Sequence, residues 1–167
     1  MLMSESYKEE TRVSKTCFTR DRKLPFKDLM VFLLRGAYKS LSVELESFFQ
    51  KLGKDGASLS KQAVSKARRN IKHTGFVKIN DTIVEEYYSE PYKTYKGYRI
   101  LSADGSMIEL PCDEDITKSF GKMNHNSSWV NCGWSMTIHD VLNNIIVDSC
   151  LHPYGISERS YLTQQIT

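Results

Sequence analysis

Asp104 is the residue whose type and position most directly suggest chemistry. It follows a short apolar run, residues 100–103, and precedes Gly105, Ser106 and a half-apolar run that ends at Leu110. A β-rich run bounded by turn residues predicts a mostly buried strand ending at Asp104. A buried carboxylate is costly unless it is paired, hydrogen-bonded or metal-bound, so one interpretation is a metal-binding or catalytic Asp. The other, which spacing alone favours, is a β-hairpin turn, because Asp-Gly is a strong hairpin dipeptide.

A second chemical pattern is a run of basic residues, without any acid, over residues 58–72. Small apolar residues recur there at helical spacing and predict an amphipathic helix with Ser58 or Ser60 as its N-cap. The predicted inner face holds Ala63, Val64, Ala67 and Ile71. The predicted outer face holds the candidate DNA-binding side chains: Lys61, Gln62, Ser65, Lys66, Arg68, Arg69 and Lys72.

Two further helices are predicted before the basic one. Apolar residues at helical spacing predict one over residues 26–34, ending near Gly36, and another over residues 41–52, ended by Gly53. Two short helices joined by a tight glycine-containing turn, the second of them basic, match the helix-turn-helix pattern.

On the outer face of a recognition helix, some side chains contact bases and others contact phosphates. On that interpretation Gln62, Ser65 and Arg69 lie near base edges. Lys61, Arg68 and Lys72 lie near phosphates, which supply most of the affinity. The alternative is a solvated face on an ordinary three-helix bundle.

Short motifs surround Asp104 in the order Gly97-Tyr98-Arg99, Ile100-Leu101, Asp104-Gly105-Ser106 and Leu110-Pro111. Farther along come Phe120-Gly121, an Asp140-x-x-Asn143 turn leading into the apolar residues 145–147, and Ser157-Glu158-Arg159. Together these segments resemble, in order, those of bacterial insertion-sequence transposases of the IS4 family. The resemblance extends from about Phe18 to the C-terminus.

Transposases of this family have a ribonuclease-H-like core in which an Asp-Asp-Glu triad holds two divalent cations, Mg²⁺ or Mn²⁺. The resemblance implies that Asp104 is the first carboxylate and bridges both cations. Carboxylate oxygens suit such hard ions, which activate the nucleophile and stabilise the leaving oxygen at phosphorus. The second Asp and the Glu are expected beyond Thr167. This polypeptide alone is therefore expected to lack strand-transfer activity.

The resemblance also implies partners and a location. It implies a helical DNA-binding region before the core, double-stranded DNA at the transposon ends as ligand, and a homodimer that pairs two ends. It implies a bacterial cytoplasm. No apolar run approaches the roughly 18 residues that a membrane-spanning helix needs.

Other polar residues are weaker candidates. Asp148 ends a predicted strand over residues 145–147, but its order in the chain does not match the family's second catalytic Asp. Asp140 and His139 are interpreted as turn residues after a predicted strand over residues 129–138, and Ser157 as the N-cap of a helix over residues 158–166.

Two charged segments also allow a functional interpretation. The aromatic and basic residues 92–98 can stack on bases and hold phosphates, although a linker packed onto the sheet is the favoured interpretation. The acidic residues 113–115 can attract a cation, but a solvated loop is favoured for them.

Charge is divided unevenly along the 167 residues, whose net charge is +3. Residues 1–80 carry 17 Lys and Arg against 8 Asp and Glu, whereas residues 81–167 carry 6 against 12. A basic half followed by an acidic half favours a nucleic-acid-binding part beside a second part.

The predicted fold class is α+β. A helix-turn-helix-like DNA-binding region is followed by the first three strands of a truncated ribonuclease-H-like α/β core. The predicted domains are a disordered tail over residues 1–17, a helical DNA-binding domain over 18–90 and an incomplete catalytic domain over 91–167.

Two functions of different classes follow. The first is a transposase that binds terminal inverted repeats and performs metal-dependent cut-and-paste transfer, present here with only its first catalytic Asp. The second is a sequence-specific DNA-binding module without chemistry, such as a truncated transposase that competes for transposon ends.

Overall fold

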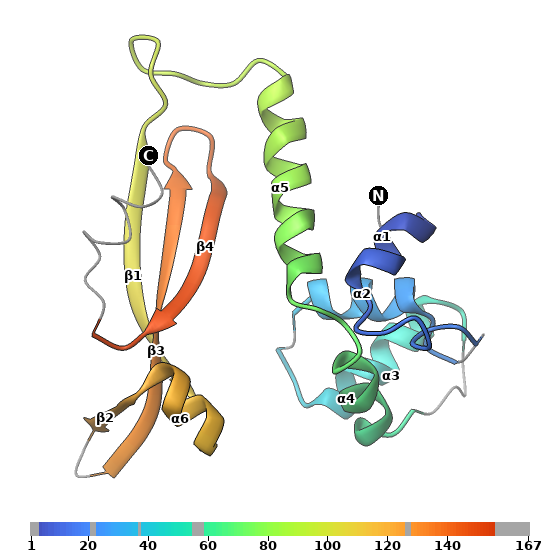
Figure 1. Ribbon diagram of the computed structural model, residues 1–167. Helices are drawn as coiled ribbons and strands as arrows, with labels where there is room; N and C mark the ends of the chain where they lie inside the picture. The colour runs from blue at the N-terminus through green and yellow to red at the C-terminus, as the bar shows by residue number, and fades with distance from the viewer. Residues whose placement is uncertain (1–3, 21–22, 37, 55–58, 126–127, 156–167) are drawn as a thin grey trace. The chain divides into compact units, whose positions relative to one another are not determined.

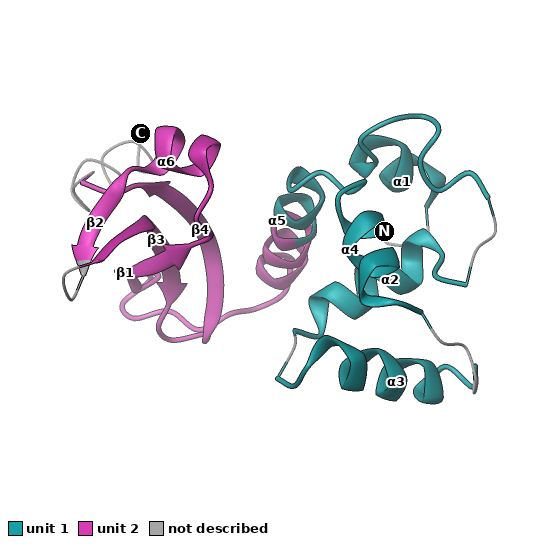
Figure 2. Cartoon of the chain, turned by 90° about the horizontal axis from the view of Figure 1, so that it is seen from below, with its two compact units in different colours: residues 1–79 teal, residues 80–167 magenta. Residues whose placement is uncertain are grey.

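The chain folds into two compact units, each described here by itself. A computed structural model describes residues 4–20, 23–36, 38–54, 59–125 and 128–155 (Figure 1). The first unit covers residues 1–79 and the second residues 80–167 (Figure 2). Within the described residues there are six helices and a four-stranded antiparallel sheet, so the predicted α+β class is confirmed.

The division lies inside a helix rather than near the predicted boundary at residue 90. Helix α5, Thr74–Ser89, contributes its first turns to the first unit and the remainder to the second. Its second part joins the sheet unit through hydrogen bonds such as the one from Asn80 Nδ2 to the carbonyl of Val147, 2.9 Å long.

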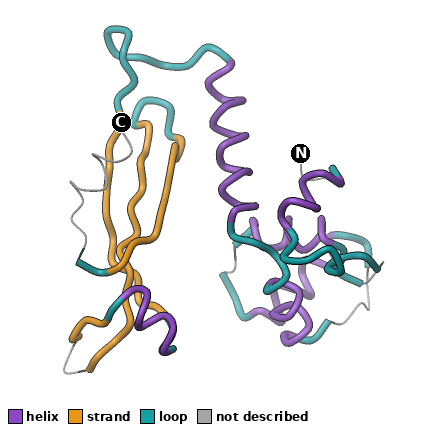
Figure 3. The backbone as a smooth tube through the Cα atoms, in the orientation of Figure 1, coloured by secondary structure: helices purple, strands orange, loops and turns teal. Residues whose placement is uncertain are grey.

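The first unit is helical, as its periodicity predicts. It contains α1 (Glu5–Thr11), α2 (Phe26–Leu34), α3 (Leu41–Lys51) and α4 (Lys61–Arg68) (Figure 3). Helix α3 is terminated just after Lys51 by Gly53, whose φ is +65°. The N–H groups of Gly53 and Lys54 donate to the carbonyls of Gln50 and Phe49. This pairing satisfies carbonyls that the helix end leaves open. The main apolar core contains Leu29, Phe32, Leu45, Phe48, Phe49 and Val64.

The N-terminal segment was predicted to be disordered over residues 1–17, whereas the structure has α1 there. Tyr7 on α1 is buried, and its hydroxyl donates to the carbonyl of Gly75 at 2.9 Å. Thr11 packs so closely on Gly75 that a Cβ at position 75 would overlap the Thr11 methyl group. The segment was predicted to be disordered because its composition is polar. Burial of Tyr7 and Thr11 outweighs that composition and stabilises the helix.

The second unit is built on one long central strand, β3, Ser128–Asp140. β1 (Leu101–Leu110) pairs along one side of β3, and β2 (Lys122–His125) and β4 (Ile145–Pro153) pair along the other, all antiparallel. The sheet therefore has three long strands and one short one.

The predicted end of a strand at Asp104 is wrong, and so is the hairpin alternative. β1 runs without a turn from Leu101 to Leu110, and Asp104, Gly105 and Ser106 pair with residues 135–137 of β3. Ladder hydrogen bonds to a long partner strand outweigh the local preference of Asp-Gly for a turn. The strand is also mostly exposed rather than mostly buried.

Two other predicted segments differ in the same way. β4 continues past Asp148 to Pro153, so Asp148 lies within the strand. The acidic loop becomes the start of α6, Glu114–Phe120, because the Asp113 side chain caps it by accepting from the N–H groups of Asp115 and Ile116. The helix predicted after Ser157 falls outside the described residues. Among the described helices, none combines the length and apolarity required to cross a membrane.

We expect Gly75→Ala to destabilise the first unit by about 1–3 kcal/mol, because an added methyl group overpacks the contact with Thr11. Urea unfolding followed by far-ultraviolet circular dichroism measures the change. Thr74→Ala, an exposed neighbour on the same helix, is the control and should shift stability by less than about 0.5 kcal/mol. Equal stabilities for the two variants would contradict the close contact.

Candidate nucleic-acid interface

Helix α4 is held by a narrow apolar stripe. Val64 is buried in the main core, and Ala67 and Ile71 pack against it. Ser60 caps the helix, its Oγ accepting from the N–H of Ala63 at 3.1 Å, as one of the two predicted caps. Ala63 differs from the prediction, because it is exposed rather than on the inner face.

The predicted DNA-binding side chains of this segment are all exposed: Lys61, Gln62, Ser65, Lys66, Arg68, Arg69 and Lys72. Lys61, Lys66 and Arg68 lie on the helix, and Arg69 is its C-cap. None of these four cations forms an ion pair within the described part of the chain. The first turn holds no acid, so Lys61 and the positive end of the helix both favour an anion.

Lys72 has a different setting from the others. It lies beyond α4, its backbone N–H donates to the carbonyl of Thr11, and its ammonium donates to the carbonyl of Glu10 at 3.1 Å. Because the carbonyls at a helix end attract cations, Lys72 caps the C-terminus of α1. This contact gives Lys72 a structural role.

The connection between α3 and α4 is longer than expected. It spans residues 52–60, whereas a helix-turn-helix joins its helices by a turn of about three or four residues. Gly53 does end α3 as predicted, but α4 begins only at Lys61. The predicted tight turn falls partly on residues 55–58, which lie outside the described residues, so it stays a prediction.

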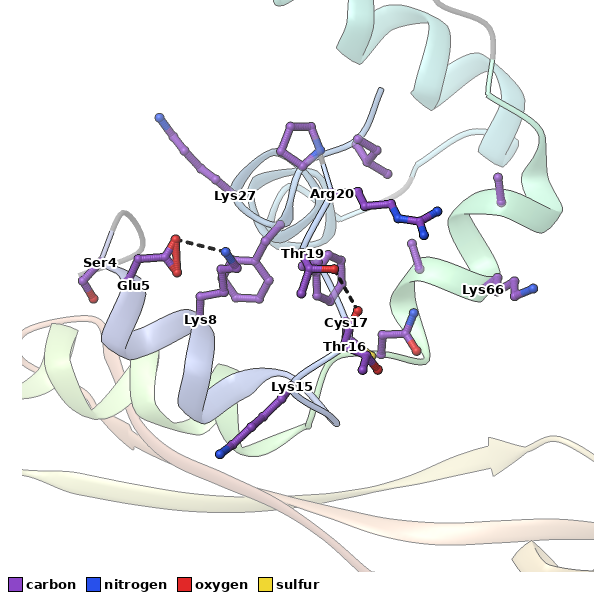
Figure 4. A pocket seen from close by; sticks show the side chains of 17 residues that line it. Ser4, Glu5, Lys8, Lys15, Thr16, Cys17, Thr19, Arg20, Lys27 and Lys66 are labelled. Atoms are coloured by element: carbon purple, nitrogen blue, oxygen red, sulfur yellow. Dashed lines mark hydrogen bonds and ion pairs between the residues drawn. The ribbon is translucent and has the colours of Figure 1, made fainter. Parts of the chain in front are cut away.

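A basic groove adjoins α4, with a cavity volume of about 1010 Å³ (Figure 4). Its apolar lining includes Phe18, Leu24, Phe26, Ala63 and Ala67. Its charged lining comes from separate segments and consists of Lys8, Lys15, Arg20, Lys27, Lys66 and one acid, Glu5. Glu5 accepts from Lys8 at 3.0 Å, so the charge left over in the groove is positive.

The loop that forms one wall of this groove is held at several points. The buried guanidinium of Arg12 donates to the carbonyl of Cys17 at 3.0 Å and pairs with Glu9. Phe18 has a φ of +57°, uncommon for a bulky residue, and its ring packs edge-on against Phe26 with centroids 5.3 Å apart. Such strain persists only where the surroundings fix it, and it is frequent at functional sites.

Asp104, the predicted catalytic residue, is exposed in the middle of β1. Its carboxylate accepts from the N–H of Gly105 at 3.0 Å. Side chains opposite each other in an antiparallel pair project to one face, so Asp104 shares a face with Thr137. Ser102 and Ser106, two residues away along β1, lie on that face as well.

The described residues do not make a magnesium site around Asp104. Asp148 pairs with Ile138, the neighbour of Thr137, so it projects from the opposite face of the sheet. No three potential metal ligands come together anywhere in the described ranges. An exposed carboxylate beside hydroxyl groups does not fit a pair of divalent cations, which requires several carboxylates.

Asp140 is a structural carboxylate, as its interpretation as a turn residue predicts. It is fully buried at the end of β3. Its Oδ2 accepts from the hydroxyl of Tyr88 at 2.7 Å and from Asn143 Nδ2 at 2.9 Å, and its Oδ1 accepts from the N–H groups of Leu142 and Asn143. His139 contacts Asn144 at 3.2 Å and takes no part in a catalytic cluster within the described residues.

These contacts set the pKa values of the pair. Burial raises the pKa of Asp140, but hydrogen bonds from Tyr88, Asn143 and Leu142 outweigh it and leave the pKa below its ordinary value. Burial and the bond to Asp140 raise the pKa of Tyr88. The pair, of which Asp140 is buried, thus holds the end of α5 against the β3–β4 turn with a charged hydrogen bond.

The sequence patterns did not predict the basic groove. Its cations are scattered between residues 8 and 66, and only Lys66 belongs to the predicted basic helix. The available signal was the basic excess of the whole first half, which does not say where the charges meet.

Comparison of the chain with protein-family models, with curated proteins and with solved structures finds no match.

We expect Tyr88→Phe to cost about 1.5–3 kcal/mol near pH 7, because it removes a hydrogen bond to a charged group. Stability from the ionised Asp140 is complete above the unfolded pKa of about 3.9 and is lost as pH falls through its lower folded pKa. The cost of Tyr88→Phe should therefore shrink by about pH 3, measured by urea unfolding with tryptophan fluorescence.

Tyr87→Phe is the matched control, because the Tyr87 hydroxyl donates to the neutral amide oxygen of Asn143. Its cost should not depend on pH over this range. A Tyr88→Phe cost that is the same at both pH values would show that the Asp140 charge does not strengthen the bond.

Proposed function

We propose that the first unit binds double-stranded DNA through the exposed face of α4 and the adjoining basic groove. The observation that carries this proposal is the groove, which is lined by Lys15, Arg20, Lys27 and Lys66 from separate segments and whose single acid is already paired. The excess of positive charge around one groove favours the binding of phosphates.

Phosphate recognition fits the chemistry of both surfaces. Arg and Lys side chains supply most protein–DNA contacts to the backbone, and these contacts fix the position of the protein on the duplex. Gln62, Ser65 and Arg69 recur on one side of α4 and are the residues proposed to reach base edges. Lys61 and Arg68 are proposed to hold phosphates.

The wider proposal is that the chain is the N-terminal part of an IS4-like transposase acting on transposon ends in a bacterial cytoplasm. Three observations support it: a helical unit with a basic excess precedes a sheet, the sheet contains three long antiparallel strands, and Asp104 lies on the first of them with its carboxylate exposed. Asp104 is proposed as the first carboxylate of a catalytic set, and the homodimer is proposed as the unit that pairs two ends.

The second candidate is a DNA-binding module without chemistry. It is supported by the exposed, isolated position of Asp104, which has no cluster of metal ligands around it among the described residues. Asp104→Asn in a longer, active chain distinguishes the two: the transposase proposal requires loss of strand transfer with DNA binding intact, whereas a binding module is indifferent to the change.

We expect Arg68→Ala with Arg69→Ala to weaken binding to a duplex of transposon-end sequence by about tenfold or more at low salt. The slope of log affinity against log salt should become shallower by about 1, because Arg68 is the one of the two that is proposed to neutralise a phosphate, and a lost phosphate contact reduces the slope by roughly 0.9. Fluorescence anisotropy at about 50 and 200 mM salt, with a random duplex alongside, measures both effects.

Lys118→Ala with Lys122→Ala removes two exposed cations from the second unit and is the matched control. It should leave affinity and slope nearly unchanged. If both double variants lose affinity equally, binding reflects net charge alone and the α4 assignment fails.

We expect Arg20→Ala with Lys27→Ala to reduce the salt slope by about 2, and to weaken random and transposon-end duplexes equally, because groove cations contact phosphates and not bases. Lys39→Ala with Lys51→Ala, exposed lysines of the first unit outside the groove, is the control. Preferential loss of one duplex sequence would instead place Arg20 or Lys27 against base edges.

A further inference from the structure

A β-hairpin with a two-residue turn precedes β1 and exposes a pair of tyrosines at its tip. Tyr95 and Tyr98 exchange backbone hydrogen bonds of 2.8 and 3.0 Å around Lys96 and Gly97. Lys96 and Gly97 have φ values of +52° and +83°, and positive φ at both positions is the mark of a type I′ turn. The tyrosine side chains are 58% and 74% exposed.

The base of this loop is fixed, although its tip is free of packing. The Asn143 side chain accepts from the N–H of Lys93 at 2.8 Å and donates to the carbonyl of Lys93 at 3.0 Å. Tyr92 packs edge-on against Tyr88 with ring centroids 4.8 Å apart, and the Arg99 guanidinium lies 4.6 Å from the centroid of the same Tyr88 ring. These contacts correct the expectation that residues 92–98 pack onto the sheet, because only the base of the segment is anchored.

Positive charge is concentrated at the same place. Lys93, Lys96 and Arg99 are half of the six Lys and Arg in residues 81–167, and residues 91–99 contain no acid. The Lys96 ammonium lies 5.4 Å from the Tyr95 ring centroid. In a unit whose net charge is otherwise acidic, this loop is a local site for an anionic partner with flat apolar groups.

We propose that the tip formed by residues 95–98 is a stacking platform for unpaired DNA bases. Tyr95 and Tyr98 supply exposed π-faces, and Lys93 and Lys96 attract the backbone phosphates on either side of the stacked bases. Proteins that bind single strands combine aromatic rings with cations in this manner, and every base presents a π-face, so recognition tolerates sequence. The positive-φ turn holds the tyrosines in place before binding, which limits the entropy that is lost.

This proposal goes beyond duplex binding by the first unit, because it uses other residues and another form of DNA. The hairpin is an anchored projection with its own aromatic rings and cations, so its binding of unpaired bases does not depend on the α4 assignment.

The test is fluorescence anisotropy of the whole chain with a labelled oligothymidylate single strand and with a duplex of equal length. Tyr95→Ala with Tyr98→Ala should weaken single-strand binding by at least about tenfold and change duplex binding less than about twofold. Tyr95→Phe with Tyr98→Phe should retain the affinity, because stacking needs the ring and not the hydroxyl. Tyr95→Leu with Tyr98→Leu should lose it.

Two further variants make the result specific. Tyr38→Ala removes a tyrosine of the first unit that is 93% exposed and should change nothing. Lys96→Asn keeps the turn, because Asn-Gly suits type I′, and should weaken single-strand binding and its salt dependence through loss of one charge.

Single-strand affinity that does not depend on Tyr95 and Tyr98 would overturn the proposal and leave the tip to a protein partner. Leu variants that bind as tightly as Phe variants would overturn it too, since stacking would then be unnecessary. Failure of the duplex proposal is separate: it appears as an unaltered duplex affinity in Arg68→Ala with Arg69→Ala, while the tyrosine effect on single strands remains.

Discussion

The burial of Val64 among the aromatic rings of α2 and α3 is the contact on which the basic surface depends. Helix α4 is only eight residues long and highly charged, and so short a helix is not stable in water without tertiary packing. Val64 turns one narrow side of the helix into the core and thereby directs every cation outward. The groove has the same origin, because its wall at Ala63, Lys66 and Ala67 is the flank of the helix that Val64 holds.

Periodicity predicted α2, α3, α4 and the central strand, since each buries one stripe or one face. α2, α3 and α4 lie where their apolar spacing places them, and β3, where Cys132 and Met136 are both buried, contains the predicted strand over residues 129–138. The rest depended on distant partners. α1 forms because Tyr7 reaches Gly75, and β1 passes through Asp104 and Gly105 because β3 supplies a ladder for them. Neither partner is near in sequence.

The candidate site likewise has one part that the local sequence pattern predicts and another that depends on distant contacts. Exposure of the basic side chains of α4 could be read from the helical pattern, because a face opposite an apolar stripe is solvated. The presence of Lys15, Arg20 and Lys27 around one groove could not be read from the sequence, since it depends on the path of a loop that Arg12 and Phe18 hold. The sequence motif singled out Asp104, but the side chains that surround it are determined by the pairing register of the strands. That register places Asp148 on the other face of the sheet.

The anchoring of the Tyr95–Tyr98 hairpin has an evolutionary consequence. The Asn143 clamp and the Tyr88–Tyr92 contact hold the loop from below, and the tip is closed only by its own two backbone hydrogen bonds. Substitutions at positions 95 and 98 therefore disturb no packing in the sheet, provided that residues 96 and 97 keep their positive φ values. Such a tip can diverge quickly while the scaffold beneath it is retained, so related chains can acquire different ligand preferences from one fold.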